Sequence, residues 1–108
     1  MEARLGQLVG ADAAVPADAA DLSVYGLSAD SRDVRKGFVF AALPGTSNDG
    51  ARFIPQAVAA GAVAVIAMPG TQAPVPVLAT DNPRRLLALM AARFFHRQPN
   101  TIVAVTGT

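Results

Sequence analysis

Phosphate-binding chemistry is suggested by the last residues of the sequence, Thr106-Gly107-Thr108. The β-branched residues 101–105 before them are typical of a buried strand, and a strand that runs into a glycine turn begins a phosphate-binding loop. Such a loop holds phosphate with backbone amides and then needs a lysine and a hydroxyl residue for phosphate and Mg²⁺. No Gly-Lys-Ser or Gly-Lys-Thr occurs in the sequence. We therefore expect the front part of a longer nucleotide-using enzyme, with no catalytic residue and no activity of its own.

Two polar loops that follow apolar stretches form a second candidate site. They are Asp30-Ser31-Arg32 and Thr46-Ser47-Asn48-Asp49-Gly50. Ligands of α/β sheets bind beyond the strand ends, and the hydroxyl and amide groups of these loops match the edge of a pyrimidine. The second loop also precedes a predicted helix, whose first N–H groups favour an anion or a carbonyl-rich ring. The structural alternative is that Asp49 caps this helix and the other residues form ordinary turns; on spacing alone, that interpretation comes first.

Composition argues against several other classes of function. The sequence has no cysteine and one histidine, so neither a disulfide framework nor a thiolate metal site is expected. The net charge of +1 does not predict nucleic-acid binding. No stretch approaches the ~20 apolar residues of a membrane span, and a cytoplasmic protein is expected. His96 and Arg93 are interpreted as partners of a helix dipole, and Arg84 and Arg85 as solvated side chains.

The predicted elements that position these loops alternate between helices and strands. The spacing of apolar residues, interrupted by Pro, Gly and Asn, predicts helices over 4–9, 52–60 and 83–96. It predicts strands over 22–29, 38–43, 62–68 and 75–79. Asn82-Pro83 predicts a helix start and Gly61 a helix end. The strand at 62–68 is apolar on both faces and therefore central. The result is an α/β domain whose bulky core residues are expected to be Phe38, Phe40, Phe53, Phe94 and Phe95.

A longer pattern adds a resemblance to a known family. It runs Asp30-Ser31-Arg32-x-Val34-x-x-Gly37-x-x-Phe40-x-Ala42-x-x-Gly45-x-x-x-Asp49-Gly50-x-x-Phe53-Ile54-x-x-Ala57-x-x-x-Gly61-Ala62. This resembles the N-terminal domain of the Mur ligases, the ATP-dependent enzymes that build the peptide stem of bacterial peptidoglycan. The resemblance covers most of residues 27–108. It is strongest to the MurE type, the UDP-N-acetylmuramoyl-tripeptide synthetases, because of the Arg-Phe-Phe-His at 93–96 and the Thr-Gly-Thr ending; the MurF type is the alternative.

The resemblance implies how the chain is organised. Residues 1–99 would form the N-terminal UDP-substrate-binding domain, a small α/β domain with a mixed sheet of about four to five strands flanked by helices. Residues 100–108 would be the first strand and truncated P-loop of the central ATPase domain. The UDP contacts carried over by position are Ala29, Ser31, Thr46, Ser47 and Asn48, and the ATP-loop residues are Gly107 and Thr108. Some relatives have His-Gln-Ala at 46–48, so backbone contacts carry over more readily than side-chain contacts.

The resemblance also implies a reaction. The full-length enzyme would use ATP and Mg²⁺ to join the carboxylate of UDP-N-acetylmuramoyl-L-alanyl-D-glutamate to the amine of a third residue, usually meso-diaminopimelate or L-lysine. This chain would hold the UDP part of the substrate, and it would have no catalytic residue, no metal ligand and no cofactor. Two alternatives are that the chain is a folded scaffold without ligand affinity of its own, and that it self-associates through the open edge of residues 101–105.

Overall fold

Four short parallel strands form the central sheet of this computed structural model, which describes residues 3–44 and 50–96. They are β3 (Gly26–Ser28), β4 (Phe38–Ala41), β5 (Ala64–Ala67) and β6 (Val77–Ala79), and they lie side by side in that order. The register pairs Leu27 with Val39 and Val65 with Val77. The inner strands β4 and β5 are almost continuously buried, as expected of parallel strands covered on both faces. All four carboxyl ends therefore lie at one edge of the sheet.

A separate antiparallel pair is made by β1 (Ala3–Arg4) and β2 (Ser23–Val24). The expected α/β architecture is confirmed, but the predicted strand over 22–29 is divided at Tyr25 between two sheets. The Tyr25 N–H donates to the carbonyl of Gly37 at 2.9 Å. Just beyond it, a Cβ atom on Gly26 would lie 2.5 Å from the ring of Phe38, so a residue without a side chain lets β3 approach β4. Parallel and antiparallel pairs thus occur in different sheets rather than in one mixed sheet.

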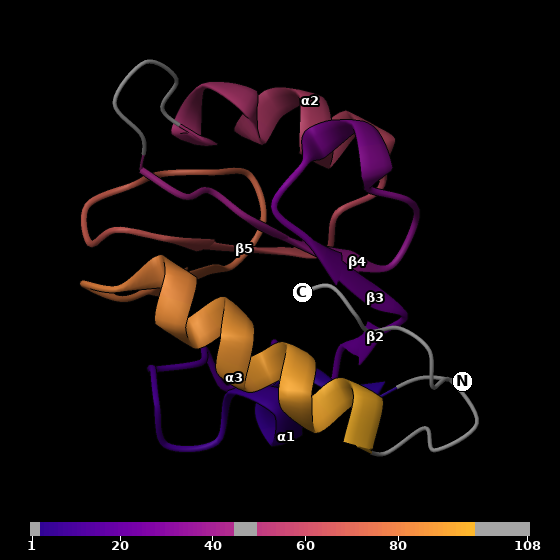
Figure 1. Ribbon diagram of the computed structural model, residues 1–108, viewed down its shortest axis with the longest axis vertical. Helices are drawn as coiled ribbons and strands as arrows, with labels where there is room; N and C mark the ends of the chain where they lie inside the picture. Colours follow the sequence, from indigo (N-terminus) through magenta and orange to yellow (C-terminus); the bar gives the residue numbers. More distant parts are fainter. Residues whose placement is uncertain (1–2, 45–49, 97–108) are drawn as a thin grey trace.

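Helices cover both faces of the central sheet (Figure 1). On one face lies α2 (Ile54–Ala60), with the short 3₁₀ turns η1 (Ser31–Asp33) and η2 (Gly50–Phe53). On the other lie α1 (Leu5–Val9) and α3 (Pro83–His96). Alternate strand residues point to opposite faces, so Val39 and Ile66 join the core under α1 and α3, whereas Phe40 and Val65 join the core under α2.

The predicted helix ends are confirmed. The Asn82 side-chain oxygen accepts a hydrogen bond from the Arg85 N–H at 3.1 Å, directly before Pro83 begins α3. At the end of α2, Gly61 has a φ of 116°, and its N–H reaches the carbonyls of Ala57 and Val58. These two caps fix where the helices meet the sheet.

Two expectations about side chains are wrong. Phe40 and Phe94 are buried, but Phe53 is 36% exposed and Phe95 45% exposed, so these two are not core residues. Arg93 is directed away from the end of its own helix. Its guanidinium donates to the carbonyls of Leu8 (2.7 Å) and Val9 (3.0 Å) and to Oδ2 of Asp12 (2.6 Å). Because the last carbonyls of a helix have no partner within it, Arg93 caps α1 from α3.

Candidate functional site

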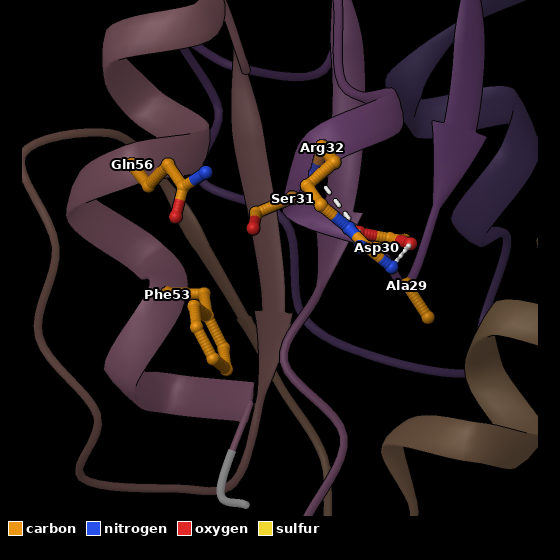
Figure 2. A pocket seen from close by; sticks show the side chains of 6 residues that line it. All are labelled: Ala29, Asp30, Ser31, Arg32, Phe53 and Gln56. Carbon is orange, nitrogen blue, oxygen red and sulfur yellow. Dashed lines mark hydrogen bonds and ion pairs between the residues drawn. The ribbon is translucent and has the colours of Figure 1, made fainter.

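A pocket of about 440 Å³ opens at the carboxyl edge of the sheet, between the end of β3 and α2. It is lined by six residues, Ala29, Asp30, Ser31, Arg32, Phe53 and Gln56. Figure 2 shows Phe53 and Gln56 on one side, Ala29, Asp30 and Arg32 on the other, and Ser31 between them. This is the edge where open α/β sheets bind their ligands.

The first wall of the pocket is a turn fixed by hydrogen bonds of its own. Ser28 Oγ accepts from the Asp30 N–H at 3.0 Å and lies 3.2 Å from the Asp30 carbonyl, to which it donates. Asp30 Oδ1 in turn accepts from the Arg32 N–H at 2.9 Å, and the Asp30 carbonyl accepts from the Asp33 N–H. These local bonds are the reason that Asp-Ser-Arg forms a 3₁₀ turn, and they fix Ser31 between two anchored residues.

The Arg32 and Asp30 side chains form a two-pronged ion pair. Nε and Nη2 of Arg32 lie 3.1 and 2.9 Å from Oδ1 and Oδ2 of Asp30. The hydrogen bonds from the Arg32 side chain and backbone hold the pKa of Asp30 below its ordinary value, and Asp30 raises the pKa of Arg32. The Arg32 side chain is 82% exposed, so the pair contributes little to overall stability. Its consequence is local, because Nε and Nη2 of the guanidinium bond to a residue of the same turn.

Ser31 is the one buried polar residue in the described part of the chain, with 8% of its surface exposed. Its hydroxyl makes no hydrogen bond to any residue within 3–44 or 50–96. Buried polar groups in native proteins are almost always hydrogen-bonded, to protein or to water. A hydroxyl that is buried, lacks a partner in this part of the chain and lines a pocket is available to a ligand.

The second wall was missed by the sequence reasoning. Phe53 ends η2 and Gln56 lies three positions later in α2, so both side chains are on the same side of the helix start. The sequence pattern predicts Phe53 in the core and gives Gln56 no role in a site. The sequence does carry one signal for this wall. A polar residue stands three positions after an aromatic one, in a helix that otherwise turns Ile54 and Ala57 inward.

The structure brings together two of the predicted UDP contacts, Ala29 and Ser31. Thr46, Ser47 and Asn48 lie outside the described residues, as do Gly107, Thr108 and the predicted strand over 101–105. The two described residues that flank the second loop are joined, because the Gly50 N–H donates to the Leu43 carbonyl at 2.9 Å. They lie after β4, the neighbour of β3, so both polar loops start from adjacent strands at the same edge.

Metal and membrane functions gain no support from the described residues. Within them, no group of three or more His, Cys, Asp or Glu side chains is placed to hold a metal ion. None of the helices in this part of the chain has the length and apolar character needed to cross a membrane.

Comparison with protein families gives one match along most of the domain. A family model described as "Mur ligase family, catalytic domain" matches residues 23–95. The chain is also 56% identical over 109 residues to the UDP-N-acetylmuramoyl-L-alanyl-D-glutamate–2,6-diaminopimelate ligase of Bradyrhizobium diazoefficiens, covering 97% of this chain and 22% of that protein. With the ligase of the same name from Mesorhizobium japonicum the identity is 54% over 92 residues, covering 82% of this chain and 19% of that protein. The chain thus spans about a fifth of the length of these relatives.

Solved structures with the same fold come from related ligases. MurF from Acinetobacter baumannii superposes with a TM-score of 0.74 at 25% identity, over 94% of this chain and 22% of that chain. MurF ligase from Thermotoga maritima in complex with ADP gives a TM-score of 0.56 at 31% identity, over 65% of this chain and 16% of that chain.

Proposed function

Because the chain belongs to the Mur ligase family, we propose that it is the UDP-binding domain of a ligase that adds a third amino acid to UDP-N-acetylmuramoyl-L-alanyl-D-glutamate. The observation that carries this proposal is the 56% identity, along nearly the whole chain, to a ligase named for that substrate and for 2,6-diaminopimelate. We take diaminopimelate as the third amino acid for the same reason. The activity belongs to peptidoglycan synthesis in the cytoplasm.

The role of this chain in the reaction is to bind the UDP moiety of the substrate. The pocket at the carboxyl edge offers the buried Ser31 hydroxyl on a hydrogen-bonded turn, beside Ala29. Thr46, Ser47 and Asn48 would add contacts from the second loop. Binding energy gained on this remote part of the substrate helps to place the reacting carboxylate.

ATP and Mg²⁺ belong to the rest of such a ligase. The sequence has no Gly-Lys-Ser/Thr, and the described residues have no set of side chains that fits a metal ion. We therefore assign no step of the phosphoryl transfer to residues 3–96. Gly107 and Thr108 are proposed as the start of the ATP loop, and the boundary between the UDP-binding domain (1–99) and the central domain (100–108 onward) is part of the same proposal.

Two alternatives have less support. A MurF-type ligase is the first, but identity to the MurF structures is 25–31%, about half that to the diaminopimelate ligases. A scaffold without ligand affinity is the second, and the pocket with its available Ser31 hydroxyl argues against it.

Calorimetric titration tests the proposal. The intact polypeptide that contains this chain and a version truncated after residue 99 are both titrated with UDP, and the truncated version is also titrated with ADP. UDP is expected to bind both proteins, with affinity reduced by Ser31→Ala, and ADP is expected not to bind the truncated one. Absence of UDP binding to the intact polypeptide, or equal affinity in the Ser31→Ala variant, would show that the site assignment is wrong.

A further inference from the structure

The middle of α3 is apolar on every side. Residues 86–92 are leucine, alanine and methionine only, and these seven residues make about two helical turns. A helix at the surface of a globular protein usually has polar residues on its solvent side, whereas a helix that is apolar all round is usually covered all round. The sequence of α3 therefore predicts a helix with neighbours on both sides.

Only one side of α3 is covered within residues 3–44 and 50–96. Leu86, Met90 and Phe94 are buried in the core that α3 shares with α1 and the sheet. On the opposite side Ala88, Ala92 and Phe95 are exposed, and Leu89 is half-buried. Spacings of three and four residues place these four side chains along one face of the helix. We call them the outer face of α3.

Phe95 is held in its exposed position by its neighbours. Its ring is 45% exposed and packs edge-on against the ring of Phe94, with centroids 5.2 Å apart and planes at 86°. The preceding residue, Arg93, bonds to the end of α1. The last turn of α3 is thus fastened to the domain while it presents an aromatic ring outward. An exposed apolar patch that includes an aromatic residue is typical of an interaction surface.

The position of the outer face indicates which partner covers it. α3 ends at His96, and residues 97–100 separate it from the predicted strand over 101–105, the proposed start of the central domain. Four residues span at most about 14 Å, so the central domain has to begin close to Phe95. The chain spans about a fifth of the length of its relatives, so such a ligase has ample further chain to cover this face.

A tethered domain also has an advantage over a second copy of the chain. A short linker gives the attached partner an effective concentration of about 1 mM. A small apolar patch is therefore occupied by the attached domain under conditions in which a free second copy is too dilute to compete.

We propose that the outer face of α3 is the surface on which the central domain of the same polypeptide docks. This inference rests on the domain boundary given in the proposed function, but it does not depend on the UDP pocket. The pocket lies between β3 and α2, and α2 and α3 cover opposite faces of the sheet (Figure 1). A contact on α3 fixes how the pocket is oriented toward the ATP loop without covering the pocket.

Thiol reactivity in the intact polypeptide tests whether this face is covered. Ala92→Cys places a thiol on the outer face, and Ala59→Cys is the matched control, an exposed alanine of α2. Peptide-resolved mass spectrometry gives the rate at which each thiol reacts with a maleimide, relative to the same site in urea. A contact with a dissociation constant of about 0.1 mM is closed about tenfold more often than open at 1 mM, so Ala92→Cys is expected to react about tenfold more slowly than Ala59→Cys.

Cross-linking identifies the partner. The photoreactive residue p-benzoylphenylalanine at position 95 keeps an aromatic ring at that place. Illumination of the intact polypeptide is expected to join position 95 to a peptide beyond residue 100 within one chain.

The outcomes separate this inference from the proposed function. Equal reactivity of the two thiols would overturn docking, and so would cross-links between two chains with a protection that is lost on dilution. Thermal unfolding checks that each variant folds, and Ala88→Cys, one turn earlier, repeats the measurement if Ala92→Cys is unstable. UDP titration of the same polypeptide is independent: UDP binding without protection rejects docking alone, and protection without UDP binding rejects the UDP site alone.

Discussion

Replacing Ser31 by alanine is expected to separate stability from binding. In the free chain the Ser31 hydroxyl is buried and has no partner within the described residues. A buried polar group without a partner costs about 1–3 kcal/mol, and its removal by a smaller apolar group of similar shape relieves that cost. Water reaches the hydroxyl from the pocket, so the lower end of this range applies. We expect Ser31→Ala to raise the free energy of unfolding by about 1 kcal/mol.

The same substitution should weaken the complex. If the hydroxyl bonds to UDP, its loss removes one hydrogen bond, which corresponds to a roughly two- to twelvefold weaker affinity. Urea unfolding without ligand measures the first effect, and repeating it at increasing UDP concentration measures the second, because a ligand that binds only the folded state stabilises it by mass action. The variant should be more stable alone and gain less from UDP.

Ser28 provides the matched comparison on the same turn. Its hydroxyl bonds both the N–H and the carbonyl of Asp30, so Ser28→Ala should lower the free energy of unfolding by about 1–2 kcal/mol. The reasoning is refuted if Ser31→Ala destabilises the free chain as much as Ser28→Ala does, since that result requires a protein partner for the Ser31 hydroxyl in the absence of ligand.

Three further substitutions test the scaffold of the site. Arg93→Met removes the cap of α1 and should lower the free energy of unfolding in urea by about 2–3 kcal/mol, because buried carbonyls lose a charged donor. Asp12→Asn removes only the ion pair and should lower it by under about 1 kcal/mol. Equal effects of the two substitutions would mean that the ion pair, and not the cap, matters. Gly61→Ala should cost more than about 1 kcal/mol, because φ is 116° there and a Cβ would lie 2.5 Å from Lys36 Cα; a neutral result in thermal unfolding would contradict this. The pKa of Asp30 is lowered by folding, so the stabilisation from its ionised carboxylate is present above the ordinary aspartate pKa and is lost as the pH falls through the lowered value. Asp30→Asn should therefore flatten the pH dependence of the free energy of unfolding in that acidic window. An unchanged acid profile would argue against this.

The candidate site was only partly predictable because its two walls come from distant segments. The Asp30-Ser31-Arg32 turn could be recognised, since its bonds are local and use residue types that favour turns. Phe53 and Gln56 could not be placed opposite it. Helical periodicity put Phe53 on an apolar face, but in the folded chain its ring is 36% exposed and lines the pocket.

The sequence by itself determined the local structure and the family of this protein. Asn82-Pro83 and Gly61 set helix ends through backbone bonds within a few residues, and the alternation of apolar and turn residues marked the inner strands β4 and β5. The tertiary structure decided which segments meet. The division of residues 22–29 between two sheets and the capping of α1 by Arg93 both depend on partners far away in the chain. Periodicity reports which side chains share a face of one element, whereas pairing and packing between elements are selected by the fit of the whole core.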